Sequence, residues 1–284
     1  MNNKVGASRV AIIGLTRGYN GKLDNYKDLI KRNKLIFEKI NSKIANPYEI
    51  ILFHEGNIPE ADQLYIKDNS PEKIKFVDVG EIFFKYKNID GYKIMCKFQM
   101  YYLWNYVDEF EYVIRIDEDI FMENFNTNTI KIMKNKKIDF YYSKLSYESH
   151  VPTNNSLPEF IKRLYKLTNT KFYNHLFPYT NFYITKTNIW KKDDVNSKLR
   201  EIAECKDQEK FRWGDLPVLG CLLKIEKMKV KRLKKLSYYH SSHNILVKNH
   251  IFSHVVDYFN YKRFIYLFPS FFYNLKKVIK LFKS

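Results

Sequence analysis

Three acidic side chains follow an apolar run near the middle of the chain. Residues 112–121 read Tyr-Val-Ile-Arg-Ile-Asp-Glu-Asp-Ile-Phe, so the acids are Asp117, Glu118 and Asp119. The β-branched and aromatic residues before them predict a buried strand. Carboxylates are costly to bury unless a cation compensates for them. The Asp-x-Asp spacing therefore indicates a divalent-metal site and, through the metal, a diphosphate site; an acidic loop that is solvated or caps a helix is the alternative.

Two later segments carry side chains that suit the same chemistry. Trp213-Gly214-Asp215-Leu216-Pro217 predicts a tight loop that places Asp215 at a helix start, either as a site carboxylate or as an N-cap. Residues 238–243 read Tyr-Tyr-His-Ser-Ser-His. An imidazole from this loop could complete a metal site that already contains two aspartates, and surface histidines are the alternative. Arg115 shares a strand face with Asp117, where it could orient that carboxylate or contact a phosphate.

Apolar runs alternate with amphipathic segments in the first half of the chain, and this order predicts the scaffold. Strands are predicted at 10–15, 48–54, 75–79 and 112–117, and helices at 25–40 (with a solvated basic face) and 92–106. Such alternation is typical of a mostly parallel sheet covered on both faces. The less regular second half predicts strands at 139–143 and 182–185 and helices at 157–167, 195–204 and 218–225. We expect one domain over 1–248 and a basic, aromatic helical tail over 249–284.

Composition narrows the class of protein. The chain has 284 residues, of which 45% are hydrophobic, enough for a large core. Its net charge of +18 suggests nucleic acid, an anionic membrane surface or phosphorylated substrates as partners. The 3 cysteines show no CxxC spacing, which argues against a disulfide framework or zinc site and fits a reducing compartment. Neither a signal peptide nor a transmembrane helix is expected from the hydropathy pattern.

Five motifs follow one another within residues 10–244. They are Gly91-Tyr92-Lys93-Ile94-Met95-Cys96-Lys97-Phe98, Arg115-Ile116-Asp117-Glu118-Asp119, Asn181-Phe182, Arg212-Trp213-Gly214-Asp215-Leu216-Pro217-Val218 and Tyr239-His240. In this order they resemble the Kre2/Mnt1 family of α-1,2-mannosyltransferases, which are retaining enzymes. The resemblance implies an α/β chain of the GT-A type, a Rossmann-like nucleotide-sugar-binding fold whose mixed central sheet is flanked by helices.

The resemblance also implies roles for individual residues. Asp119 would be the main ligand of Mn²⁺ (or Mg²⁺), with Asp117 beside it facing the donor and His240 completing the metal site. Asp215 would lie near the acceptor and serve as the base for its hydroxyl. Four more residues would form the donor pocket. Tyr92 and Arg115 would line it, and Tyr92 also counts among the catalytic positions. Arg17 would contact the nucleotide, and Lys97 would contact the phosphates.

Two positions depart from the family pattern. Tyr183 stands where the family has a Glu after Asn-Phe, a candidate nucleophile or stabiliser of the sugar cation. We count Tyr183 among the catalytic positions, but a tyrosine supplies no carboxylate at neutral pH. Retention would then need help from another group, or attack by the acceptor on the face that the diphosphate leaves. Glu118 stands where the family has Pro and is the acid of the three least expected to bind metal.

The resulting hypothesis is a metal-dependent glycosyltransferase that uses a nucleotide sugar, with GDP-mannose favoured, and a glycan or lipid-linked glycan as acceptor. The segment 258–284 has six Lys or Arg and no acid among many aromatic residues, which predicts an amphipathic segment on an anionic membrane, or alternatively a helix packed on the domain. We therefore expect a cytoplasmic protein, peripheral at the inner face of the membrane. The alternatives are a nucleic-acid-binding or processing protein, which the absence of Walker, RNP and zinc-finger motifs disfavours, and an inactive GT-A scaffold that binds glycans.

Overall fold

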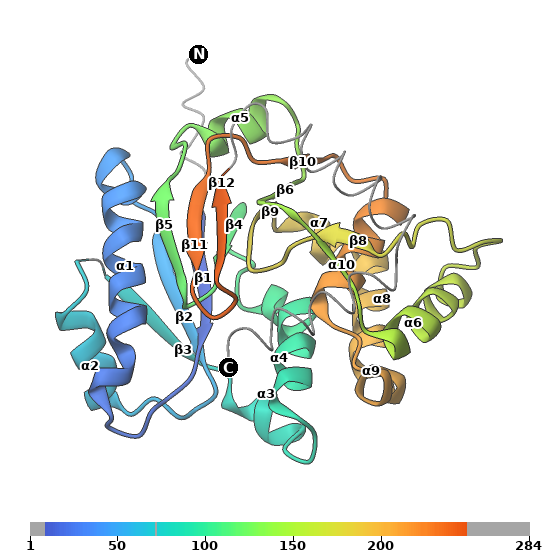
Figure 1. Cartoon of the computed structure of the whole chain (residues 1–284), viewed down its shortest axis with the longest axis horizontal. Coiled ribbons are helices and arrows are strands. Elements are labelled where there is room, and N and C mark those ends of the chain that lie inside the picture. The colour runs from blue at the N-terminus through green and yellow to red at the C-terminus, as the bar shows by residue number, and fades with distance from the viewer. Residues whose placement is uncertain (1–8, 72, 249–284) are drawn as a thin grey trace, which may run out of the picture.

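The computed structural model describes residues 9–71 and 73–248, and these residues build a mixed central sheet (Figure 1). The strand order is β3-β2-β1-β4-β9-β6-β10. The first four strands along the chain run parallel to one another, whereas β9 is antiparallel to both β4 and β6. The strands are β1 (Val10–Thr16), β2 (Glu49–His54), β3 (Ile74–Asp78), β4 (Tyr112–Ile116), β6 (Phe140–Tyr142), β9 (Phe182–Lys186) and β10 (Val230–Arg232).

Both faces of this sheet are buried, which explains why its central strands read as continuous apolar runs. In β1, Val10 and Ile12 belong to one hydrophobic cluster and Ala11 and Ile13 to the other. The first cluster receives side chains from α1 (Lys27–Lys39), α2 (Glu60–Asp68) and α5 (Thr129–Asn135). The second receives side chains from α4 (Gly91–Met100), α8 (Asp193–Glu204) and α10 (Asp215–Ile225). The three-layer α/β architecture predicted from the sequence is confirmed.

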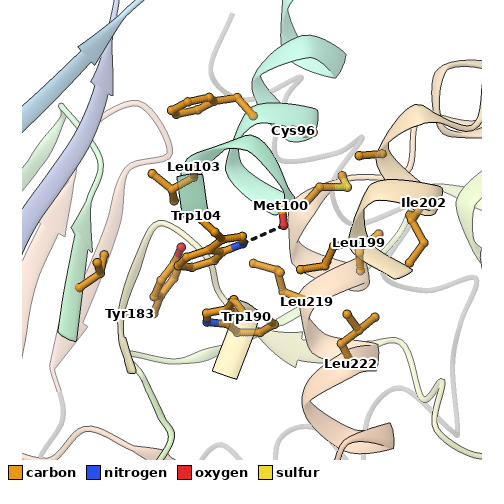
Figure 2. Close-up of a cluster of buried hydrophobic side chains, with 14 of the residues drawn as sticks. Cys96, Met100, Leu103, Trp104, Tyr183, Trp190, Leu199, Ile202, Leu219 and Leu222 are labelled. Atoms are coloured by element: carbon orange, nitrogen blue, oxygen red, sulfur yellow. Dashed lines mark hydrogen bonds between the residues drawn. The ribbon is translucent and has the colours of Figure 1, made fainter. Parts of the chain in front are cut away.

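Two indoles anchor the second cluster (Figure 2). Trp104 and Trp190 stack with ring centroids 5.3 Å apart, and both are fully buried. Each indole N–H has a partner, since Trp104 Nε1 donates to the Met100 carbonyl at 3.0 Å and Trp190 Nε1 donates to Thr185 Oγ1 at 2.8 Å. Tyr183 on β9 packs beside them, with its ring stacked on Phe140.

A second, smaller sheet lies on the α1 side and was missed by the sequence patterns. It consists of β5 (Ile120–Asn124), β11 (Ser237–His240) and β12 (Ile245–Lys248). The chain leaves β4, turns through Glu118 and Asp119, and enters β5 directly. β11 pairs antiparallel with β5 and places His240 opposite Ile120. A two-stranded ribbon forms from β7 (Leu145–Tyr147) and β8 (Leu176–Pro178).

The remaining predicted elements agree with the structure apart from their ends. The helix expected over 92–106 stops at Met100 and continues as a 3-10 helix over Tyr102–Asn105, and the one expected over 157–167 begins earlier, as α6 (Val151–Leu164). Short helices α3 (Gly80–Lys85), α7 (Asn188–Lys191) and α9 (Lys206–Phe211) complete the covering layers. The tail predicted over 249–284 lies outside the described residues. Within 9–71 and 73–248, no helix combines the length and apolarity needed to cross a bilayer.

Candidate active site

The strand order reverses between β1 and β4, and the three acids lie at that point. From β1 the chain proceeds to β2 and β3 on one side and then returns to β4 on the other. In open α/β sheets, ligands bind outside the carboxyl ends of the strands at such a switch point. Thr16 ends β1 and Ile116 ends β4. Asp117, Glu118 and Asp119 follow β4 directly and therefore lie at the expected ligand crevice.

Asp119 faces the β11–β12 hairpin. Its Oδ1 lies 3.2 Å from His240 Nε2, and its Oδ2 accepts a hydrogen bond from the Ser242 backbone N–H at 3.0 Å. Its carbonyl also accepts from the Ser241 N–H at 3.1 Å. Burial opposes ionisation of Asp119, but the hydrogen bonds from His240 and Ser242 outweigh it and hold the pKa of this carboxyl well below its usual value. Asp119 is therefore a carboxylate at neutral pH.

The imidazole of His240 is buried and oriented from its other side. Its Nδ1 lies 3.0 Å from Asn181 Nδ2 and 3.3 Å from the Tyr179 hydroxyl. Asn181 is itself fixed, because its Oδ1 accepts from the Tyr238 hydroxyl at 3.2 Å. Because the Asn181 amide nitrogen can only donate, it leaves the proton of a neutral imidazole on Nε2, which faces Asp119, and it fixes the orientation of the ring. The Asn181-Phe182 motif thus contributes a support for His240.

Arg115 joins Asp117 to Asp215. Its Nη1 donates to Asp215 Oδ2 at 2.6 Å and its Nε donates to Asp117 Oδ1 at 3.0 Å. The Arg115 side chain is only 5% exposed, and burial alone would lower its pKa, but the two carboxylates raise the pKa far above the usual value. Burial raises the pKa of Asp117, and Arg115 opposes that rise. The buried guanidinium of Arg115 therefore compensates two carboxylates, those of Asp117 and Asp215, which are 98 positions apart in the sequence.

Asp215 also faces α4. It is the first residue of α10, after the N-cap Gly214, so the helix N-terminus adds favourable partial charge to this carboxylate. Cys96 Sγ lies 3.9 Å from Asp215 Oδ1. Tyr92 lies one turn before Cys96 on α4, half exposed, with the Arg212 guanidinium 4.5 Å from its ring centre. The thiol of Cys96, burial and Asp215 together raise the pKa of Tyr92, which is therefore a neutral phenol.

Comparisons with known proteins show what the chain and its fold are similar to. The chain is 27% identical over 186 residues to the probable mannosyltransferase KTR3 of Saccharomyces cerevisiae, a match covering 58% of this chain and 46% of the relative. The structure matches core-mannan synthase A (Ktr4) of Aspergillus fumigatus, solved with Mn and GDP, at a TM-score of 0.66 and 18% identity, covering 85% of this chain and 77% of the other. The chain is a distant relative of the Kre2/Mnt1 mannosyltransferases.

A second solved structure supports the same fold. The mannosyltransferase Ktr4p of S. cerevisiae in complex with GDP matches at a TM-score of 0.65 and 16% identity, over 82% of this chain and 71% of the other. The chain therefore has the GT-A fold that its motifs implied. No family model matches it, and it spans about half the length of the curated relative.

The predicted metal ligands are only partly brought together. Within the described residues, no three His, Cys, Asp or Glu side chains converge as a complete metal-binding group, because Asp117 turns to Arg115. The prediction of Asp117 as a direct ligand is therefore not supported by this geometry. Asp119 and His240 do fit one ion, since two donor atoms about 2.1 Å from a metal and at right angles to each other lie about 3 Å apart. Their observed separation is 3.2 Å.

Lys97, expected against the donor phosphates, lies elsewhere. Its side chain is fully buried between α4 and the α8–α9 corner, where Nζ donates to the Ala203 carbonyl and forms an ion pair with Glu209 at 3.2 Å. This lysine ties covering helices together, and the prediction that it lines the donor pocket is wrong for this conformation. Arg17 is placed as predicted, after β1 with a side chain 67% exposed, and its Nε donates to the Tyr19 hydroxyl at 3.2 Å.

Tyr183 is fully buried directly opposite Arg115 in the β4–β9 pairing. Its ring centre lies 5.8 Å from the Arg115 guanidinium, and burial raises its pKa well above that of a free tyrosine. A direct catalytic contact of Tyr183 stays a prediction. Its position shows a neutral side chain packed behind the Arg115 network.

A buried arginine below the crevice was not predicted. Arg32 lies on the face of α1 that was expected to be solvated, yet it is fully buried. Its Nη2 donates to the Ile116 carbonyl at 2.7 Å, at the peptide that leads into Asp117. An added Cβ on Gly14 would lie 3.0 Å from both Arg32 Nη2 and the Ile116 oxygen, so a larger residue would crowd this contact and force a small shift. A glycine inside an apolar strand was the available signal.

Proposed function

We propose that this chain is a metal-dependent glycosyltransferase that moves a hexose, mannose from GDP-mannose being favoured, to a hydroxyl of a glycan or lipid-linked glycan. The observation that carries the proposal is the Asp119–His240 pair at the carboxyl end of β4, in a fold shared with a mannan synthase solved with Mn and GDP. A hard carboxylate and an imidazole suit Mn²⁺, and its remaining positions would go to diphosphate oxygens and water.

The charge distribution supports departure of a nucleoside diphosphate. Bound between Asp119 and His240, a divalent ion would stabilise the negative charge that develops on the leaving diphosphate. The protein contributes rigidity to these two ligands, because Ser242 holds the Asp119 carboxylate and Asn181 holds the imidazole. Arg115 adds a positive charge between this pair and Asp215 that needs no rearrangement during the reaction.

Asp215 is our candidate for accepting the proton of the acceptor hydroxyl. It lies across Arg115 from the metal-facing turn and next to the half-exposed Tyr92, which offers an aromatic surface for a sugar. A positioned carboxylate that takes such a proton contributes typically 10²- to 10⁴-fold to the rate. Arg115, which donates a hydrogen bond to Asp215, would hold the protonated Asp215 near the negative charge that develops on the leaving diphosphate.

The stereochemical course that we propose is retention through attack on the face from which the diphosphate leaves. Tyr183 occupies the position of the family's Glu, and its buried phenol provides no carboxylate nucleophile at neutral pH. In same-face attack, the acceptor oxygen bonds to the anomeric carbon as the bond from that carbon to the diphosphate breaks, and the acceptor's proton goes to Asp215, so a covalent sugar–enzyme intermediate is unnecessary.

The test is a panel of nucleotide sugars, including GDP-mannose, GDP-fucose, UDP-glucose and UDP-galactose, with MnCl₂ and with EDTA. We expect Mn²⁺-dependent release of GDP from GDP-mannose and thermal stabilisation by GDP with Mn²⁺. Asp119→Ala and His240→Ala should each abolish both effects, whereas Glu123→Gln, an exposed acid on the neighbouring β5, should leave them unchanged. Retained Mn²⁺-dependent activity in Asp119→Ala would refute the assignment. Binding of GDP and Mn²⁺ without transfer to any acceptor would instead support a glycan-binding scaffold.

We also propose that the protein acts at the inner face of the membrane, on the composition of 258–284 alone. Its six basic residues and many aromatics would attract an anionic leaflet. Vesicles containing phosphatidylserine should sediment the full chain and not a chain ending at residue 248, and vesicles of phosphatidylcholine should sediment neither. Equal sedimentation of both chains by anionic vesicles would contradict this.

A further inference from the structure

The outer face of the small sheet carries a row of apolar side chains. Phe121 on β5 lies opposite Tyr239 on β11, and Tyr239 lies opposite Leu246 on the edge strand β12. Their neighbours Met122 and Tyr238 belong to the hydrophobic core, so strand alternation turns the row to the other face. The rings of Phe121 and Tyr239 stack with centroids 6.5 Å apart, and Leu246 is 51% exposed. The row therefore presents apolar surface at the edge of the sheet.

Helix α1 borders this row with cations. Figure 1 shows α1 alongside β5, and the two elements are in contact. Lys31, Leu35 and Lys39 recur every four residues, so they lie along one side of α1. Together with Phe121 and Tyr239 they line a hollow of about 500 Å³, and Lys31 Nζ lies 4.3 Å from the centre of the Phe121 ring. Six residues make up what we call the α1–β12 face: Lys31, Leu35, Lys39, Phe121, Tyr239 and Leu246.

The chemistry of the α1–β12 face suits the headgroup region of an anionic membrane. Lysine side chains lay their aliphatic stems on apolar surface and keep the ammonium group in water, where it can meet a lipid phosphate. Aromatic and aliphatic side chains between such cations settle at the boundary between headgroups and acyl chains. A site for a small molecule would instead enclose it with converging, fixed polar groups. Here the hollow is open, and its charged groups are Lys31, Lys39 and the exposed Glu123.

The end of β12 connects this face to the basic, aromatic end of the chain. β12 ends at Lys248, and only residues 249–257 separate it from the segment 258–284. A chain of that length spans at most about 35 Å, so 258–284 begins close to the α1–β12 face. Two surfaces joined by so short a linker bind one membrane more tightly than either does alone. The β11–β12 hairpin also carries His240, so a membrane on this face would lie near the metal-binding pair.

We propose that the α1–β12 face rests on an anionic phospholipid membrane, with lipid phosphates at Lys31 and Lys39. The inference rests on the proposed attachment through 258–284 and adds that the folded domain contacts the bilayer in one orientation. Each lysine near an anionic surface strengthens binding about fivefold, so two lysines orient the domain without holding it there alone. The orientation turns the hairpin that carries His240 toward the leaflet, where a lipid-linked acceptor would be found.

The first experiment measures sedimentation of the full chain with vesicles of phosphatidylcholine and phosphatidylserine over a range of lipid concentrations. Lys31→Gln combined with Lys39→Gln should lower the partition coefficient about tenfold or more. The charge-matched control combines Lys206→Gln with Lys210→Gln, two exposed lysines of α9 at the opposite end of the molecule (Figure 1), and should change it by about twofold or less. Glu123→Gln removes the acid that lines the same hollow and should raise it, by about fivefold at most.

The second experiment reports contact at the apolar row. The native indoles of Trp104, Trp190 and Trp213 are fully buried, so an indole added at the surface gives a separate signal against the wild-type spectrum. The emission of Leu246→Trp should shift to shorter wavelength when the phosphatidylserine vesicles are added. Val151→Trp, at a 63% exposed position on α6, should show no shift.

Three results would overturn the inference and leave the proposed function standing. They are a Lys31 and Lys39 double variant that binds vesicles as its control does, equal emission shifts at positions 246 and 151, and a wild-type dimer in solution that the double variant abolishes. The last result would assign the face to a second copy of the chain. The double variant should keep the melting temperature and its stabilisation by GDP with Mn²⁺, which shows that it folds. A wild-type chain that ignores anionic vesicles would refute membrane attachment and this inference together, without affecting sugar transfer.

Discussion

Arg115 pairs with two carboxylates of unequal burial, and removing each should cost a different amount of stability. The side chain of Asp215 is 7% exposed and lies 2.6 Å from the guanidinium, whereas that of Asp117 is 28% exposed and lies 3.0 Å away. Breaking a buried ion pair from one side costs about 3–5 kcal/mol, and breaking an exposed pair about 1 kcal/mol or less. We expect Asp215→Ala to cost about 3 kcal/mol, at the lower end because Asp117 still neutralises Arg115, and Asp117→Ala about 1 kcal/mol.

The measurement is urea-induced unfolding of the full chain at pH 7 without metal or nucleotide, followed by far-UV circular dichroism and extrapolated linearly to water. The matched control replaces both members of the buried pair, as Arg115→Met with Asp215→Leu. Apolar side chains of similar volume often replace a buried pair at little cost. The double variant should therefore lose less stability than the sum of the losses measured for Arg115→Met and Asp215→Leu alone, by about 1.5 kcal/mol or more.

Equal costs for Asp215→Ala and Asp117→Ala would refute the reasoning, since burial would then not decide the strength of the two contacts. Additive costs in the double variant would refute it as well, because they would show that Arg115 and Asp215 stabilise the fold independently. A loss of stability with an unchanged rate of sugar transfer would separate the structural role of Asp215 from the proposed role as a base.

Three single substitutions test other contacts of the structure. Gly14→Ala should cost about 1–3 kcal/mol in the same urea assay, because its Cβ presses on the buried Arg32 guanidinium, and no measurable cost would mean that Arg32 rearranges freely. Trp190→Ala should cost about 3–5 kcal/mol because it empties the stack on Trp104, whereas a cost below about 1 kcal/mol would show that this core refills. Tyr183→Phe should keep the transfer rate within about tenfold, since loss of a true acid or base typically costs 10²- to 10⁴-fold; a larger loss would make the Tyr183 hydroxyl catalytic.

The scaffold was predictable because its strands are buried on both faces. Strands β1, β2 and β4 appear in the sequence as short apolar runs, and the amphipathic α1 separates the first two. Such alternation implies parallel strands, and parallel strands place their carboxyl ends at one edge. The turn containing Asp119 was therefore predicted as a candidate site from local sequence, and the structure places it at that edge of the sheet.

The small sheet was not predictable in the same way. Strand β5 begins directly after the acids, and β11 pairs with it across more than a hundred residues, as Ile120 opposite His240 shows. Short strands with one exposed face carry little periodic signal, and no local pattern reports a partner so distant in sequence. The role of His240 came from the family resemblance, and the β5–β11 pairing supplies its physical reason.

Side-chain direction on helices was the second limit. Arg32 was expected on a solvated helix face and Lys97 against the donor phosphates, because a basic residue is almost never fully buried unless it is paired. Both are buried here, Lys97 against Glu209 and Arg32 against backbone carbonyls. Such partners come from the packing of other elements, so a helical period alone could not show that these cations point inward.

The three consecutive acids act on different neighbours because the chain turns at each of them. Asp117 still follows the strand and meets Arg115 on its own face, Glu118 reaches back to Thr16, and Asp119 faces the hairpin that carries His240. A proline at the middle position, as in the related family, would form the turn without an acceptor toward β1. The acid here adds a negative charge beside two others, which is unfavourable unless it gains a partner. The hydrogen bond from Thr16 offsets part of that cost, so Glu118 is held against the end of β1.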